Sequence, residues 1–265
     1  MSLLGSILDA KRAEIDALRG APAPAAPARA PISVTGALAR GRGASAPLRL
    51  VAEVKFKSPS AGALSTRLGP GERAVAYASA GAAMVSVLTD ASFFAGSFAH
   101  LAAARAALDA EGLAVPLLCK DFVLDAVQLD AARAHGADAV LLIVRTLSSP
   151  RLSELVAEAR DRGLEPLVEV TNDDELDAAL AAGARVVGVN ARDLDTLEMD
   201  AARATRVASK IPNDAIALHL SGVRSEDDVR AIAAGRCDAA LIGEVLMRQD
   251  DPRPRLASFV RAAAG

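Results

Sequence analysis

One short segment places charged side chains inside a run of apolar residues. Residues 50–62 read LVAEVKFKSPSAG, and in an extended strand Glu53 and Lys55 lie two apart, on the same face. That face also carries Val51, so both charges occupy a surface that elsewhere would be core. Burying a charge is costly unless it is paired or neutralised. A paired carboxylate and ammonium at a strand end can exchange protons with a bound molecule, so we interpret this segment as the wall of a site.

Lysine is rare in this chain, which makes its placement informative. Only five of the 30 basic residues are lysine. Arginine is effectively always charged, whereas burial can tune the pKa of a lysine so that it exchanges protons. Lys55 lies inside one apolar run and Lys120 directly follows another, and these positions favour a chemical role for both.

Short apolar runs recur from residue 48 and alternate with alanine-rich segments of helical spacing. The runs begin about 20 to 35 residues apart, which is enough for one strand and one helix each. Eight such units predict an α/β fold, the (β/α)₈ TIM barrel. A doubly wound open sheet is the alternative, but the number of units and the lack of a G-x-G-x-x-G motif disfavour it. The expected strands are residues 49–54, 84–88, 115–119, 138–143, 165–170, 185–190, 216–220 and 239–243.

A different pattern precedes the barrel. Residues 3–19 predict an extra N-terminal amphipathic helix, and the proline- and alanine-rich residues 21–33 predict an extended linker. We therefore assign residues 1–47 to the helix and linker and residues 48–265 to the barrel, as a single structural domain on which the extension packs. The expected apolar face of the helix consists of Leu3, Ile7, Ala10, Ile15 and Leu18.

Composition and charge exclude several classes of protein. No apolar run approaches the roughly 20 residues of a membrane span, and the N-terminus lacks the pattern of a signal peptide. A net charge of −3 gives no reason to expect binding to nucleic acid or a membrane surface. Two cysteines are too few for a disulfide framework, and the three histidines lack metal-ligand spacing. We expect a cytoplasmic protein with no metal site that is a monomer, with a dimer as the alternative.

In parallel barrels, catalytic residues gather at the carboxyl ends of the strands. A single polar residue there is often only the start of a solvated loop, but several lysines and glutamates on one rim indicate a site. After the seventh and eighth strands, Gly222 and Gly243 allow backbone N–H groups to approach an anion, although either glycine could simply make a tight turn. Two of them in successive loops favour phosphate. The polar strand ends are Glu53 with Lys55, Thr89, Lys120, Glu169, Asn190 with Arg192, Ser221 with Gly222, and Gly243 with Glu244.

Several segments, taken in order, resemble the indole-3-glycerol phosphate synthase family of tryptophan biosynthesis along nearly the whole chain. They are AEVKFKSPSAG, SVLTDASFFAGS, LLCKDFVLDAVQLDAARAHGADAVLLI, LVEV, GVNARDL and LIGEVLM. Short pieces such as LVEV are weak individually, but their order and spacing are specific, and the helix and linker before the first strand also match. The resemblance implies a carboxy-lyase that uses no cofactor. Its substrate would be 1-(2-carboxyphenylamino)-1-deoxyribulose 5-phosphate, converted to indole-3-glycerol phosphate with loss of CO₂ and water.

The resemblance also implies roles for individual residues. Lys120 matches the general acid of ring closure, Lys55 matches a lysine that meets the substrate carboxylate, and Glu169 matches the acid/base of the dehydration. Glu53 would hold the lysines and the substrate hydroxyls in position. The implied catalytic residues are Glu53, Lys55, Lys120, Glu169, Asn190 and Ser221.

A second set would bind the two ends of the substrate. Phe94, Phe122 and Leu141 match the anthranilate pocket, and Arg192 belongs to the polar wall of the site. Lys57 fits a solvated loop charge as well as a phosphate contact. The phosphate side would include Ser58, Ser221, Gly222, Gly243 and Glu244.

One position departs from the family pattern. Where the family reads S-E-S-G-I at the end of the seventh strand, residues 219–223 read HLSGV, so that Leu220 replaces a site glutamate. Alternation predicts Leu220 facing inward and His219 outward. The lost carboxylate could balance Lys55 and Lys120, which predicts a site that is intact in outline but slower.

Two alternative functions follow from these observations. One is another phosphosugar enzyme such as phosphoribosylanthranilate isomerase, which leaves the N-terminal helix and the set of Lys55, Lys120 and Glu169 unexplained. The other is a phosphosugar-binding barrel in which Leu220 has weakened or disabled turnover.

Overall fold

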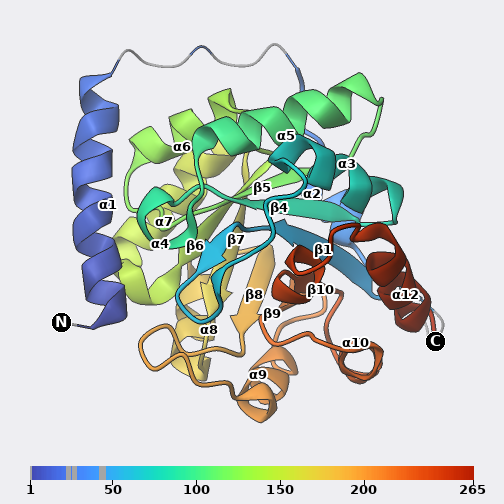
Figure 1. The fold of residues 1–265 in the computed structure, drawn as a ribbon. Helices are drawn as coiled ribbons and strands as arrows, with labels where there is room; N and C mark the ends of the chain where they lie inside the picture. Colours follow the sequence, from blue (N-terminus) through green and yellow to red (C-terminus); the bar gives the residue numbers. More distant parts are fainter. Residues whose placement is uncertain (1, 22–24, 26–28, 42–45) are drawn as a thin grey trace.

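The protein is described by a computed structural model that covers residues 2–21, 25, 29–41 and 46–265. Within these residues, eight parallel strands form a closed barrel surrounded by helices (Figure 1). Each strand agrees with its predicted range to within two residues at either end, and the predicted (β/α)₈ barrel is confirmed. The strands are β1 (Arg49–Val54), β4 (Met84–Leu88), β5 (Leu117–Lys120), β6 (Ala139–Ile143), β7 (Glu165–Val170), β8 (Val186–Asn190), β9 (Ile216–Leu220) and β10 (Ala239–Ile242).

The barrel closes because its first strand pairs with both its second and its last. Val51 of β1 pairs in register with Met84 of β4 on one side and with Leu241 of β10 on the other. The remaining strands pair in chain order. All carboxyl ends therefore meet at one mouth of the barrel, as the sequence analysis required.

Longer helices follow the strands and cover the outside of the barrel (Figure 1). Capping side chains begin several of them: Asp125 accepts a hydrogen bond from the N–H of Val127, and Asn172 accepts one from the N–H of Glu175. The loops that lead from strand to helix at the barrel mouth are consequently short in these units. The helices are α3 (Pro70–Ser79), α5 (Phe98–Ala110), α6 (Ala126–Ala134), α7 (Ser149–Asp161), α8 (Asp173–Ala181), α9 (Ala201–Ala208), α10 (Glu226–Ala233) and α12 (Arg253–Ala263).

Several short elements were not predicted, and all lie in loops that follow barrel strands. After β1, residues on either side of Pro59 form a small antiparallel hairpin. A turn of helix carries Phe94 after β4, and another begins at Glu244 after β10. These elements shape the mouth of the barrel. They are β2 (Lys57–Ser58), β3 (Gly62–Ala63), α4 (Ala91–Phe94), the 3₁₀ helix η1 (Val144–Thr146) and α11 (Glu244–Met247).

The core has two layers that follow from the alternation of side chains along each strand. On β9, Leu218 and Leu220 belong to the layer inside the barrel, whereas Ala217 packs between strand and helices. Cys119 likewise belongs to the outer layer. Both layers are built almost entirely from aliphatic side chains.

The N-terminal helix α1 (Leu3–Gly20) stands against the side of the barrel, next to α4 and α6 (Figure 1). Ile7 and Ile15 are buried as predicted, but the buried face also contains Leu4 and Lys11. Leu3, Ala10 and Leu18 are only partly buried. The predicted face was therefore slightly rotated, and it missed a buried lysine.

The segment between α1 and the barrel is not entirely a linker. Part of the linker predicted at residues 21–33 lies outside the described residues. A short helix, α2 (Val34–Leu38), follows it, because the hydroxyl of Ser33 caps the N–H of Gly36 and Val34 and Leu38 are buried. Among the residues that the structure describes, no helix has the length and apolar character needed to cross a membrane.

Candidate active site

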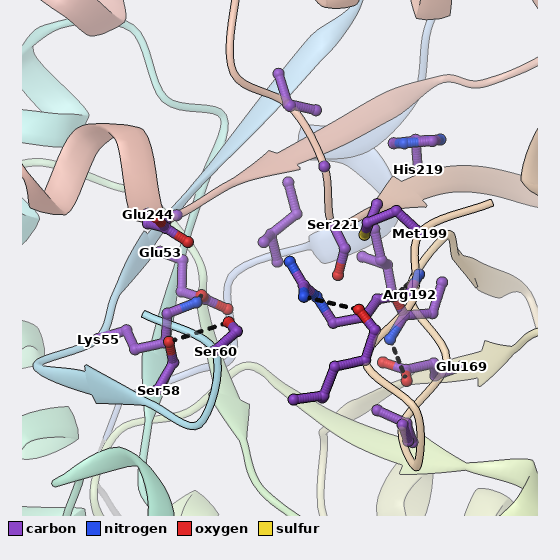
Figure 2. A pocket seen from close by; sticks show the side chains of 18 of the residues that line it. Glu53, Lys55, Ser58, Ser60, Glu169, Arg192, Met199, His219, Ser221 and Glu244 are labelled. Carbon is purple, nitrogen blue, oxygen red and sulfur yellow. Dashed lines mark hydrogen bonds and ion pairs between the residues drawn. The ribbon is translucent and has the colours of Figure 1, made fainter. Parts of the chain in front are cut away.

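A cavity of about 770 Å³ opens at the carboxyl ends of the barrel strands. Side chains from α1, from the loops after β1 and β4, and from the ends of the later strands surround it (Figure 2). Most of the residues expected at the site therefore meet in one place. The predicted residues that line the cavity are Glu53, Lys55, Ser58, Phe94, Lys120, Phe122, Glu169, Asn190, Arg192, Ser221, Gly222, Gly243 and Glu244.

Glu53 is the centre of one charged group. Lys55 Nζ donates to Glu53 Oε1 over 2.6 Å, and Lys120 Nζ lies 3.9 Å from Glu53 Oε2. The Glu53 side chain is only 3% exposed, whereas those of Lys55 and Lys120 are 16% and 21% exposed. Burial alone would raise the pKa of Glu53, but the charges of Lys55 and Lys120 outweigh burial and lower it below its ordinary value. Glu53 is thus an anion that holds two ammonium groups at the cavity.

Glu169 belongs to a second, differently balanced group. Figure 2 shows it on the opposite side of the pocket from Glu53. Asn190 Nδ2 donates to Glu169 Oε1 over 2.8 Å, and Glu169 is almost fully buried. Burial raises the pKa of Glu169 above its ordinary value, and neither the charge of Lys120 nor the hydrogen bond from Asn190 cancels that effect. Two carboxylates whose pKa values are shifted in opposite directions can divide acid, base and electrostatic roles between them.

The loops after β9 and β10 require glycine for two different reasons. Gly222 has a φ of +86°, and a Cβ there would lie 2.5 Å from Met199 Cε. Gly243 has no such conformation, but a Cβ there would lie 2.5 Å from Glu53 Oε1. Ser221 adopts a positive φ of 69° although it is not glycine, a type of strain that is found at functional sites. The backbone therefore approaches the cavity closely at both loops.

The loop after β8 is held in a defined shape beside the cavity. The N–H of Arg192 donates to Asn190 Oδ1 over 3.0 Å, and Arg192 Nη1 donates to the carbonyl of Leu197 over 3.1 Å. Arg192 also forms an isolated β-bridge with Met199. Met199 lines the cavity, and the sequence analysis missed it because no motif marked it.

The other end of the cavity is apolar. The rings of Phe94 and Phe122 lie 6.3 Å apart between centroids. Leu3, Leu4 and Ile7 of α1 line the same cavity. We expected α1 to pack on the barrel but did not assign it to the site. The apolar residues in its first turn were the feature of the sequence that could have indicated this role.

Two predicted binding residues are not brought to the cavity. Lys57 is exposed on β2 and does not line it. Leu141 on β6 is buried in the inner core and does not line it either. Among the described residues, no cluster of three or more His, Cys, Asp or Glu side chains could hold a metal ion.

Leu220 faces inward, as alternation predicted. It is 2% exposed, and a Cβ on Gly188 of the neighbouring strand would lie 2.6 Å from Leu220 Cδ1. His219 is buried on the other face of β9, where burial lowers its pKa. An apolar side chain therefore fills the position of the family's glutamate.

Comparisons with known proteins identify the family of the chain. The family model described as "Indole-3-glycerol phosphate synthase" matches residues 4–259. The chain is 42% identical to indole-3-glycerol phosphate synthase 1 of Streptomyces coelicolor, covering 99% of this chain and 96% of that protein. It is also 42% identical to indole-3-glycerol phosphate synthase of Rhodococcus jostii, covering 100% and 97%.

Solved structures share the fold at much lower identity. A crystal structure of 3-hexulose-6-phosphate synthase has a TM-score of 0.64 at 15% identity, covering 81% of this chain and 99% of that chain. Thiamine phosphate pyrophosphorylase from Pyrococcus furiosus has a TM-score of 0.60 at 16% identity, covering 82% and 95%. These structures support the barrel fold alone, whereas the sequence matches identify the family. The chain belongs to the indole-3-glycerol phosphate synthase family.

Proposed function

We propose that this protein converts 1-(2-carboxyphenylamino)-1-deoxyribulose 5-phosphate to indole-3-glycerol phosphate, CO₂ and water, without a cofactor and in the cytoplasm. The observation that carries the proposal is the pair of oppositely tuned carboxylates, Glu53 and Glu169, on opposite sides of a cavity that also holds Lys55 and Lys120. Ring closure and dehydration both need positioned proton donors and acceptors, and these four groups supply them.

Ring closure is assigned to Lys120. As the aromatic carbon attacks the ribulose carbonyl, the carbonyl oxygen gains negative charge and must take up a proton. Lys120 presents an ammonium to the cavity, and its position 3.9 Å from Glu53 Oε2 keeps that ammonium near a fixed anion. Lys120 is therefore the general acid, and Glu53 is the residue that positions it.

The later steps are assigned to Lys55 and Glu169. Lys55 is the cation available to meet the substrate carboxylate before it leaves as CO₂. The loss of water then needs an acid for the departing hydroxyl and a base for a proton of the ring system. Lys55 is assigned as the acid that protonates the departing hydroxyl. Glu169 is the base, because its raised pKa makes it a stronger proton acceptor than an ordinary carboxylate.

The two ends of the substrate fit the two ends of the cavity. The aromatic ring is assigned to the apolar end at Phe94 and Phe122, and the phosphate to the backbone around Ser221, Gly222 and Gly243.

The surface of the molecule bears on its oligomeric state. Among the described residues, Met199 is the one large hydrophobic side chain that is exposed, and it lines the cavity. Such a small number of exposed large hydrophobic side chains in the described part of the chain supports a monomer.

The test is direct because the product is an indole and the protein contains no tryptophan. Purified protein is mixed with the synthetic substrate, and indole fluorescence is followed with time. We expect fluorescence to grow in proportion to enzyme concentration, and we expect the dephosphorylated substrate analogue to need a much higher concentration for the same rate. The proposal fails if the parent protein produces no indole fluorescence, or if substrate and analogue react equally well.

A further inference from the structure

Lys11 is a buried lysine that the proposed reaction does not use. Its side chain is 1% exposed, and its Nζ lies 2.7 Å from Asp121, 3.1 Å from Asp90 and 2.5 Å from Glu14. Burial alone would lower the pKa of Lys11, but the neighbouring carboxylates more than offset it and raise the pKa above its ordinary value. Lys11 is therefore a permanent cation that joins α1 to residues following β4 and β5.

Both aspartates are connected to the walls of the cavity. Asp90 accepts a hydrogen bond from the N–H of Phe93 over 2.8 Å, which caps α4, the helix that ends at Phe94. Asp121 directly follows Lys120 and accepts hydrogen bonds from Thr89 Oγ1 over 2.7 Å and from the N–H of Phe122 over 2.8 Å. The Lys11 ammonium thus touches the two turns that present both phenylalanines of the apolar end and, one residue away, Lys120.

Lys11 supplies the positive charge of a group that is otherwise negative: the charges sum to −2 with Lys11 and to −3 without it. One ammonium faces three carboxylates, and the side chains of Asp90 and Asp121 are 0% and 4% exposed. Without Lys11, two buried carboxylates would lie unpaired against a helix that carries Glu14. Such an arrangement is strongly unfavourable. Separation of α1 from the barrel would relieve it by admitting water, and α1 also supplies Leu3, Leu4 and Ile7 to the cavity wall.

We propose that Lys11 is a positioning residue for substrate binding: it locks α1 against the ends of β4 and β5 and thereby fixes the apolar end of the cavity. The inference rests on the proposed function, since the affected substrate is the one assigned above. The substrate contacts at this end exist in both the ground state and the transition state, so their loss raises KM more than it lowers kcat.

The first variant is Lys11→Met, which keeps the unbranched stem and removes the charge. Lys210→Met is the matched control, because Lys210 forms an exposed pair with Asp173 and neither residue lines the cavity. Hydrogen exchange of residues 3–20 is measured on the full chain, together with kcat and KM. For Lys11→Met we expect exchange in α1 to rise on the order of 10²-fold, as for loss of a buried ion-pair partner. We expect KM to rise about tenfold or more, because the side chains that contact the aromatic ring of the substrate would be displaced.

The second variant, Lys11→Met combined with Asp90→Asn, separates charge from packing. The asparagine side chain in place of Asp90 can still cap α4, and Asp121 keeps its donors from Thr89 and Phe122, so only one buried charge remains without Lys11. We expect exchange and KM of the double variant to move back toward those of Asp90→Asn alone. If Lys11 acted only through the packing of its aliphatic side-chain carbons, exchange and KM would not move back in the double variant. The double variant also decides the question if Lys11→Met alone does not fold.

The outcomes distinguish this inference from the proposed function. If the parent forms product but Lys11→Met retains parental KM and parental exchange in α1, Lys11 is not a positioning residue. If kcat falls while KM and exchange stay unchanged, the inference is also wrong. If the parent forms no product at all, the proposed function fails and the positioning role fails with it, whereas the exchange measurement still shows whether Lys11 holds α1.

Discussion

Two buried ion groups lie at neighbouring strand ends of this barrel, and they differ in how completely their charges are enclosed. Lys11 is 1% exposed, and its partners Asp90 and Asp121 are 0% and 4% exposed, while its third partner, Glu14, is 35% exposed. Glu53 is equally buried, but its two partners, Lys55 and Lys120, are 16% and 21% exposed at the cavity. We call Lys11 with Asp90 and Asp121 the enclosed group, and Glu53 with Lys55 and Lys120 the open group. The enclosed group has no proton donor that faces the cavity, whereas the open group has two. The enclosed group can therefore position the site, whereas the open group can also react with a bound substrate.

Lys120→Ala breaks the open group, and we expect the largest effect from it. Loss of a general acid should lower kcat by about 10²–10⁴-fold. The fold should remain intact, because Glu53 keeps its 2.6 Å pair with Lys55. Turnover is measured by indole fluorescence and folding by thermal unfolding, with Lys210→Ala as the control. Near-parental kcat in a folded Lys120→Ala protein would show that Lys120 is not the acid.

Gly243→Ala tests how tightly the open group is held. The φ of Gly243 is −122°, outside the left-handed region, and a new Cβ there would lie 2.5 Å from Glu53 Oε1. Displacing Glu53 by about 1 Å should lower kcat on the order of 10²-fold, because both lysines lose their fixed partner. Gly20→Ala is the control, since a Cβ there meets nothing within 4 Å. Equal kcat for the two variants contradicts the positioning role of Glu53.

Leu220→Glu tests the open group by adding a second carboxylate to it. A carboxylate facing the cavity should help to position the two lysines, and we expect kcat/KM to rise by up to about tenfold, or about 1.4 kcal/mol. Replacing a side chain that is 2% exposed should cost about 1–3 kcal/mol in the free energy of unfolding. Leu220→Gln controls for size without charge. If the glutamate variant is no faster than the glutamine variant, Leu220 does not mark a lost catalytic group.

The sequence predicted the barrel and most of the open group because both depend on local patterns. Apolar runs of fixed spacing located all eight strands, and polar residues directly after them, such as Lys120 and Glu169, had to share one mouth once the barrel closed. Lys57 shows the limit of that reasoning. It follows the same strand as Lys55, but the β2–β3 hairpin turns it out to solvent.

The enclosed group could not be predicted in the same way. Lys11 lies on the apolar face of α1 between Ile7 and Ile15, and a charge in that position was a visible anomaly. Its partners Asp90 and Asp121, however, lie far along the chain, and Lys11 reaches them only because α1 docks on the barrel. Met199 is similar, because a loop conformation rather than a motif places it over Gly222. Long-range contacts of this kind leave no local pattern.

The opposite shifts of Glu53 and Glu169 have a consequence for turnover that the pH dependence of kcat/KM reveals at Glu169. Glu169 acts as a base only when it is deprotonated, and its pKa is raised above the ordinary 4.5. The rate should therefore begin to fall at a higher pH than it would for an ordinary carboxylate. The same profile is recorded for Glu169→Gln, with the same substrate, so that the substrate's own titrations cancel.

We expect an acid limb in the parent with an apparent pKa above 4.5, and we expect this limb to disappear in the much slower Glu169→Gln variant. A parental limb at or below 4.5, or a variant profile with the same shape as that of the parent, would contradict the division of roles between the two carboxylates.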